Sequence, residues 1–218
     1  MREMLVKSSK YNLKCPHSMQ PEYITVHNTY NDASAHNEVQ YMILNQNQVS
    51  FHIAVDDKEE VLGIPLNRNA WHCGDGNGNG NRKSIGIEIC YSKSGGTKYH
   101  LAEGRAIVLI AKMLKERGWG IDRVKKHQDW SGKNCPHRIL DEGRWNSFLG
   151  AIKAELNKKE VKEVTNTTEL SPNQQKDKDL LVKHGLMSAN FKVQTGEMVA
   201  LLTMMAGLLR KLESKGVL

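Results

Sequence analysis

Three residues in separate parts of this chain have side chains that suit a zinc ion: His27, His127 and Cys135. Two imidazoles and a thiolate form a nitrogen and sulfur donor set, which favours zinc over magnesium or calcium, because those ions prefer oxygen ligands. Three protein ligands also leave a fourth coordination position open to water, as in catalytic zinc sites. Taken singly, each is more often an ordinary surface or core residue, since the chain has nine histidines and four cysteines. Together they indicate a metal-dependent hydrolase.

A carboxylate and an ammonium group could complete such a site. Glu88 lies in the segment 84–90, where isoleucines occupy alternate positions, so Glu88 is expected on the opposite face, toward either solvent or a cleft. Beside a metal it could act as general acid and base, taking a proton from water and returning it to the leaving amine. Lys133, close to Cys135, could stabilise the oxyanion of a tetrahedral intermediate, or could be a solvated loop lysine.

Other polar residues near these motifs have less definite roles. Asp129 could orient the imidazole of His127 from outside the coordination shell, or could cap the following turn. Three further histidines are interpreted as structural or substrate-facing rather than as metal ligands: His52, His72 and His137. Two further cysteines are interpreted as core or loop thiols: Cys73 and Cys90.

The pattern of apolar residues predicts the elements that position these side chains. Alternating β-branched and aromatic residues predict strands, and an apolar period near 3.6 residues predicts helices. Strands are expected at residues 22–27, 49–55, 60–64 and 84–90, and helices at residues 33–44, 100–118 and 142–157. The Gly- and Asn-rich segment 74–81 is expected to be a mobile loop. Strands interleaved with helices predict an α/β domain with a central mixed β-sheet flanked by helices.

The composition changes after this domain. Residues 1–158 are expected to form the catalytic domain, and residues 159–178, which are polar and lack aromatic side chains, a linker. Residues 179–218 are expected to form a small, mainly helical C-terminal module with helices at 179–184 and 195–212. A Met- and Leu-rich face of this module either forms its own core or allows self-association.

Charge and composition exclude several classes of function. The net charge of +7 favours polyanionic partners, and residues 160–218 contribute only +1 of it. Aromatic residues make up 6% of the chain and no dense basic tract occurs, so nucleic acid is not the expected partner. No apolar stretch is long enough for membrane insertion. The cysteines show no close pairing and the N-terminus lacks the apolar core of a secretory signal, which favours free thiols in a reducing cytoplasm.

Four segments resemble one known family. Residues 23–29, 49–55, 81–88 and 126–137 are similar, in order and spacing, to the zinc N-acetylmuramoyl-L-alanine amidases of phage endolysins and bacterial autolysins. They resemble animal peptidoglycan recognition proteins more distantly. The resemblance covers residues 1–158. One position departs from many relatives, which have a tyrosine where this chain has Phe51; a role for that hydroxyl would then pass to Glu88 and Lys133.

The resemblance implies a function and a set of site residues. His27, His127 and Cys135 match zinc ligands, Glu88 matches the catalytic carboxylate, and Lys133 matches a lysine that assists the transition state. The implied reaction is hydrolysis, by zinc-activated water, of the amide between N-acetylmuramic acid and the L-alanine of the peptidoglycan stem peptide. The C-terminal module would then bind the cell wall. Such an endolysin would remain in the host cytoplasm before lysis.

Two other functions remain compatible with the sequence. The chain could bind peptidoglycan without cutting it, as some relatives do, although those usually lack the cysteine that Cys135 supplies here. It could alternatively be a zinc peptidase that cuts within the stem peptide.

Overall fold

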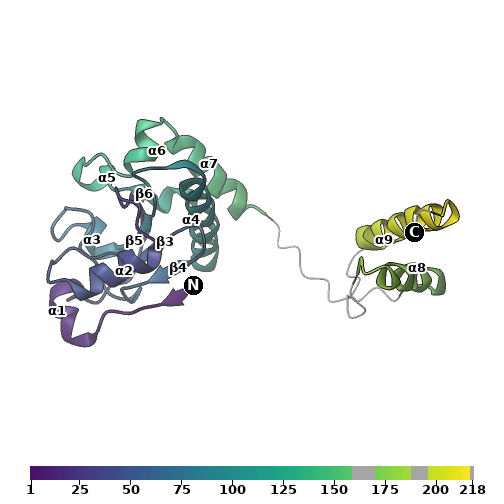
Figure 1. Ribbon diagram of the computed structural model, residues 1–218. Coiled ribbons are helices and arrows are strands. Elements are labelled where there is room, and N and C mark those ends of the chain that lie inside the picture. The colour runs from purple at the N-terminus through teal and green to yellow at the C-terminus, as the bar shows by residue number, and fades with distance from the viewer. Residues whose placement is uncertain (159–169, 188–195, 217–218) are drawn as a thin grey trace. The chain divides into compact units, whose positions relative to one another are not determined.

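The computed structural model describes residues 1–158, 170–187 and 196–216. The chain divides into two compact units, Met1–Lys158 and Lys159–Leu218, and each unit is described by itself (Figure 1). Within the described residues, no helix combines the length and the apolar character needed to span a membrane.

A six-stranded sheet forms the centre of the first unit. Its strands lie in the order β1-β4-β3-β5-β2-β6. All neighbours are parallel except β3 and β4, which are antiparallel, so the sheet is mixed as predicted. The strands are β1 (Arg2–Glu3), β2 (Tyr23–Asn28), β3 (Ile53–Val55), β4 (Glu60–Leu62), β5 (Ser84–Ile89) and β6 (Val124–Lys126).

Helices of very different length surround this sheet (Figure 1). They are α1 (Tyr11–Lys14), α2 (Ala35–Leu44), α3 (Asn79–Lys83), α4 (Gly96–Arg117), α5 (Gln128–Ser131), α6 (His137–Asp141) and α7 (Trp145–Leu156), with the 3-10 turns η1 (Ser8–Lys10) and η2 (Ile121–Arg123). Two of the longer helices have typical capping residues. The Ser34 hydroxyl caps the N-terminus of α2, and Gly118 follows the C-terminus of α4 in the left-handed conformation, with φ of 64°.

The two faces of the sheet are covered by different helices. Ile85, Ile87 and Ile89 are fully buried against α4 and α7, which confirms the alternation seen in the sequence. On the other face, Val39 and Met42 of α2 pack in a second apolar cluster with residues of β3 and β4. Glu88 lies on this second face, because it alternates with the isoleucines along β5.

The segment predicted as a mobile loop is partly ordered as a helix. Residues 79–83 form α3, and Gly80 and Asn81 are buried. The reason is a local cap: the Asp75 carboxylate accepts hydrogen bonds from the backbone N–H groups of Gly80, at 2.7 Å, and Asn81, at 3.1 Å. The prediction of a loop over the whole of 74–81 was therefore wrong. The strand expected at 49–55 is also shorter, since only Ile53–Val55 pairs in the sheet.

The second unit contains two described helices, α8 (Pro172–Lys183) and α9 (Gly196–Ser214). Ser171 and Gln174 form a capping box at the start of α8, with Pro172 in the first turn. This helix begins before residue 179, so the linker prediction of 159–178 was too long at its C-terminal end. Residues 159–169 and 188–195 lie outside the described residues, as does the first residue of the helix expected at 195–212.

Candidate metal centre and catalytic cleft

Strand register brings the candidate residues to one edge of the sheet. β2, β5 and β6 are parallel, so their carboxyl ends meet at the same edge, where α/β proteins commonly bind ligands. His27 on β2 pairs directly with Glu88 on β5. His127 follows β6, and its backbone N–H donates to the carbonyl of Val26 at 3.4 Å. The sheet thus places a histidine from each of two chain segments beside the carboxylate.

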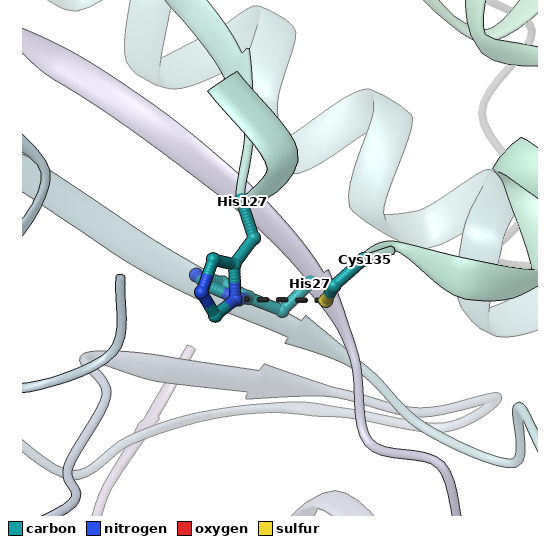
Figure 2. Close-up of side chains that lie close together, drawn as sticks. All are labelled: His27, His127 and Cys135. Carbon is teal, nitrogen blue, oxygen red and sulfur yellow. Dashed lines mark hydrogen bonds between the residues drawn. The ribbon is translucent and has the colours of Figure 1, made fainter. Parts of the chain in front are cut away.

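The three predicted metal ligands converge at this edge (Figure 2). All are buried, and their donor atoms lie within 4.8 Å of one another. His27 Nδ1 is 3.0 Å from His127 Nδ1 and 3.7 Å from Cys135 Sγ. A tetrahedral zinc ion with bonds of about 2.0–2.3 Å separates its donors by about 3.3–3.6 Å. The spacing and chemistry of the donor set therefore fit a zinc ion.

Hydrogen bonds outside the donor set fix which nitrogen of the His27 imidazole is free. His72 Nε2 lies 3.3 Å from the carbonyl of Ser84 and donates to it, so His72 Nδ1 is an acceptor. That nitrogen lies 2.8 Å from His27 Nε2, which must then carry the proton and leave His27 Nδ1 with a lone pair. His127 bonds in turn to the backbone of Cys73. The imidazoles of both candidate ligands are therefore held by hydrogen bonds to neighbouring groups.

Burial keeps the candidate ligands neutral. It holds the pKa of His27 well below its usual value, with further lowering by neighbouring His72 and His127. Burial likewise lowers the pKa of His127 to about 4 and raises the pKa of the Cys135 thiol to about 12. A coordinated metal cation is what would deprotonate such a thiol.

A second group of donors shares one of these residues. His27, His72 and Cys73 also lie within 4.8 Å of one another. Cys73 is fully buried, however, and the Nδ1 atom of its neighbour His72 already accepts a hydrogen bond from His27. The first group is the one that lines a cavity, so it is the group that water and a substrate can reach.

Glu88 and Lys133 line the same cavity as the three donors. This cavity has a volume of about 230 Å³. Glu88 Oε2 is buried without a hydrogen-bond partner among the described residues. Burial, with a smaller contribution from the nearby Glu38 carboxyl, raises the pKa of Glu88 to about 8, although the Lys133 ammonium opposes the shift. The Lys133 side chain is exposed and makes no hydrogen bond or ion pair with the described part of the chain, so its ammonium is available to a ligand.

Comparison with known proteins agrees with this geometry. A family model described as N-acetylmuramoyl-L-alanine amidase matches residues 17–138, more than half of the chain. The chain belongs to this amidase family. The matched region contains all five predicted site residues: His27, Glu88, His127, Lys133 and Cys135.

Several curated relatives are amidases from Bacillus subtilis (strain 168). N-acetylmuramoyl-L-alanine amidase XlyB is 67% identical over 158 residues, which are 72% of this chain and 50% of the relative. N-acetylmuramoyl-L-alanine amidase CwlA is 60% identical over 195 residues, which are 88% of this chain and 71% of the relative. The match thus covers half the length of XlyB and 71% of the length of CwlA.

Solved structures show the same fold for the first unit. The structure of PlyL is 58% identical, with a TM-score of 0.70, and the match covers 71% of this chain and 98% of PlyL. The catalytic domain of XlyA is 39% identical, with a TM-score of 0.64, over 69% of this chain and 97% of that domain. The amidase fold expected from the sequence is therefore confirmed.

Other residues named from the sequence have structural roles in this amidase fold. Asp129 does not reach His127: its carboxylate accepts from the backbone N–H of Lys126 at 3.0 Å and from the Lys126 ammonium at 2.6 Å. His52 bridges two backbone segments, donating to the carbonyl of Arg68 and accepting from an N–H of β5. Two cysteines are fully buried free thiols, as expected: Cys73 and Cys90.

Two of the remaining residues belong to the amidase cleft. His137 lines the metal cavity, where its ring lies 4.4 Å from that of Tyr30. His72 was interpreted as structural or substrate-facing, and its contact with the candidate ligand His27 was missed. No sequence signal marks that contact, because β2 and the segment before α3 are distant in the chain.

Proposed function

We propose that this protein is a zinc-dependent N-acetylmuramoyl-L-alanine amidase of the endolysin type, which cleaves the amide between N-acetylmuramic acid and L-alanine in peptidoglycan. The observation that carries this proposal is the convergence of His27, His127 and Cys135 in one cavity with Glu88 and Lys133, within a member of the amidase family. The known chemistry of such donor sets supports each assignment below.

The donor set is suited to zinc as the resident metal. His27 Nδ1, His127 Nδ1 and Cys135 Sγ would hold the ion, since both imidazoles are neutral and oriented by hydrogen bonds. When bound, zinc supplies Lewis acidity, which acidifies water and polarises the scissile carbonyl. The protein leaves one side of the donor set open to the cavity, where the amide would bind.

Glu88 and Lys133 are assigned the remaining steps. The pKa of Glu88, raised to about 8 by burial, suits a group that both accepts and returns a proton near neutral pH. Its carboxylate would take the proton of the attacking water and deliver it to the leaving nitrogen of L-alanine. The Lys133 ammonium would donate a hydrogen bond to the oxyanion that forms on the carbonyl. Phe51 lines the cavity without a hydroxyl, so these two residues carry the polar steps.

Product analysis tests this function. Purified cell wall treated with the wild-type protein should yield stem peptides with a free L-alanine N-terminus, together with intact muramic acid, by mass spectrometry. Glu88→Gln should retain zinc but lose about 10²- to 10⁴-fold in rate, the scale of general acid and base catalysis. Glu116→Gln, on the exposed surface of α4, is the matched control and should retain full activity.

The two alternatives give different results in the same experiment. A zinc peptidase would release fragments cut within the stem and leave L-alanine attached to muramic acid. A protein that only binds peptidoglycan would release no peptide, with or without zinc. Either outcome would overturn the proposed reaction.

The second unit is proposed to bind the cell wall and to self-associate. Met204, Leu208 and Leu212 are exposed at four-residue intervals along α9, while Leu202 and Leu209 form the unit's own core. An apolar stripe of this kind suits contact between two copies, which sedimentation of the full chain with and without Leu208→Lys would detect.

The buried free thiols also fit synthesis in a reducing cytoplasm, with action on the wall after lysis begins.

A further inference from the structure

A second cavity adjoins the metal cavity on the side of α2. It has a volume of about 310 Å³. Four residues line both cavities, so the two lie next to each other: Thr29, Val49, Phe51 and Glu88. We call this second cavity the α2 cavity, and it is near enough to the candidate metal ligands to hold another part of the same substrate.

Glu38 is the one acidic group of the α2 cavity besides Glu88 in the described part of the chain. It lies in the first turn of α2, and its Oε1 atom is buried without a hydrogen-bond partner. Burial raises the pKa of its carboxyl, which a hydrogen bond from Asn31 only partly offsets. No lysine, arginine or histidine of the described residues forms an ion pair with it. A partly buried carboxylate with an unpartnered oxygen and no cation is unfavourable, so a cationic ligand would be stabilised here.

The position of Glu38 in its helix does not account for this arrangement. A carboxylate in the first turn interacts favourably with the helix N-terminus. Ser34 already caps that end, however, by accepting from the backbone N–H of Asn37 at 3.3 Å. Glu38 instead lines the cavity.

The walls around Glu38 are suited to a hydrocarbon chain. Tyr41, Met42, Val49 and Phe51 line the α2 cavity. Phe51 and Met42 are buried in the core of this face, whereas Tyr41 and Val49 are largely exposed at its rim. These four side chains, beside the polar Thr29, Asn45 and Asn47, offer apolar contacts near a carboxylate, which matches an aliphatic chain ending in an ammonium group.

We propose that the α2 cavity is the peptide subsite, and that Glu38 accepts a hydrogen bond from the side-chain ammonium of a diamino acid in the stem peptide. The proposal rests on the proposed function, because only then does a stem peptide extend from the metal. Lysine and diaminopimelate share this ammonium. A larger cavity of about 650 Å³, which shares His72, His127 and Lys133 with the metal cavity, then remains for the saccharide.

The test compares soluble substrates that differ only in the side chain of the diamino acid. N-acetylmuramyl-L-alanyl-D-isoglutaminyl-L-lysine is compared with its Nε-acetyl derivative and with the diaminopimelate analogue. The wild-type protein should cleave the lysine peptide about 10-fold or more efficiently than the acetylated peptide, mainly through KM, because a charge-assisted hydrogen bond is lost. Glu38→Gln should abolish this preference, and Glu116→Gln should retain it. The diaminopimelate arm shows which diamino acid is preferred.

Binding of the product peptide separates this proposal from the proposed function. L-Ala-D-isoGln-L-Lys should bind the zinc-loaded wild-type protein more tightly than its Nε-acetyl form in calorimetry, and Glu38→Gln should remove the difference. Equal cleavage and binding of the free and acetylated peptides by the wild-type protein would overturn the subsite. If the wild-type protein cleaves neither substrate, the amidase proposal fails, while the binding measurement still decides the role of Glu38.

Discussion

A chain of hydrogen bonds determines the state of the candidate ligands at the scale of single residues. The carbonyl of Ser84 fixes the proton on His72, and His72 fixes the proton on His27, so that the lone pair of His27 Nδ1 faces the other two donors. Partners of this kind commonly set both the orientation and the basicity of metal-bound imidazoles. His72 would therefore position His27 for a bound zinc ion.

Replacement of His72 should weaken zinc binding. We expect His72→Ala to lower zinc affinity by about 10- to 100-fold, because His27 loses the acceptor that orients it. His72→Asn places an amide oxygen near the position of Nδ1 and should recover part of the loss. Competition with a chromophoric chelator measures both. The control His100→Ala removes an exposed histidine and should change nothing; an unaltered affinity in His72→Ala would contradict the role assigned to His72.

The side chains of the site were more predictable than their contacts. His27, His127 and Cys135 could be named from residue type and local motif, and they do converge. Asp129 was considered as a partner of His127 because the two are near in sequence, yet it bonds to Lys126. His27, in contrast, does have a hydrogen-bond partner outside the donor set, His72. The two residues are far apart in the sequence, and only the folded sheet brings them together.

At the scale of elements, a close approach between β5 and the segment before α3 supports the metal centre. The backbone N–H groups of His72 and Cys73 donate to the Asn81 side chain, each at 2.8 Å. Gly86 on β5 leaves space for the imidazole, because a Cβ there would lie 2.7 Å from His72 Nδ1. The glycine thus permits the contact on which the orientation of His27 depends.

Two glycine substitutions should have opposite effects. Gly86→Ala should displace His72, lower the thermal unfolding midpoint and weaken zinc binding, since the new methyl group overlaps the ring. Gly104→Ala is the matched control: it lies within α4, no atom lies within 4 Å of its added Cβ, and it should stabilise the protein by about 0.4–1 kcal/mol. Thermal unfolding and chelator competition measure both variants. Normal zinc affinity in Gly86→Ala would contradict the packing argument.

Long periodic elements were predictable and short ones were not. The six-residue strands β2 and β5 and the helices α2, α4 and α7 follow from apolar periodicity over many residues. β1, β6, α5 and α6 are too short to show a period, and their pairing depends on distant partners. The order in 79–83 was missed because the Asp75 cap acts through space on a Gly-rich segment whose composition suggests a loop.

At the scale of the whole molecule, charge is distributed unevenly between the two units. Residues 159–218 carry nine basic and seven acidic residues, so +5 of the net charge of +7 belongs to residues 1–158. The first unit can therefore be attracted to an anionic wall by charge alone, and this attraction should be screened by salt. Any specific wall affinity of the second unit should not depend on salt in this way.

Removal of the second unit should separate these two contributions. A chain that ends at Lys158 should cleave soluble muramyl peptides like the full chain, because the cavity residues all lie in the first unit. It should bind purified walls at low ionic strength but not at 0.5 M salt, where the Debye length falls to about 4 Å. The full chain should remain bound to the walls at 0.5 M salt. Equal release of both proteins by salt, in a wall sedimentation assay, would show that the second unit does not bind the wall.

The dependence of amide cleavage on zinc tests the central claim most directly. Release of peptides with a free L-alanine N-terminus is measured for the wild-type protein before chelation, after chelation, and after stepwise return of zinc. Activity should disappear on chelation and return fully at one zinc per chain, whereas Cys135→Ala should remain inactive at the same zinc concentration because one donor is missing. Full activity in the chelated protein, or in Cys135→Ala without added zinc, would contradict the account.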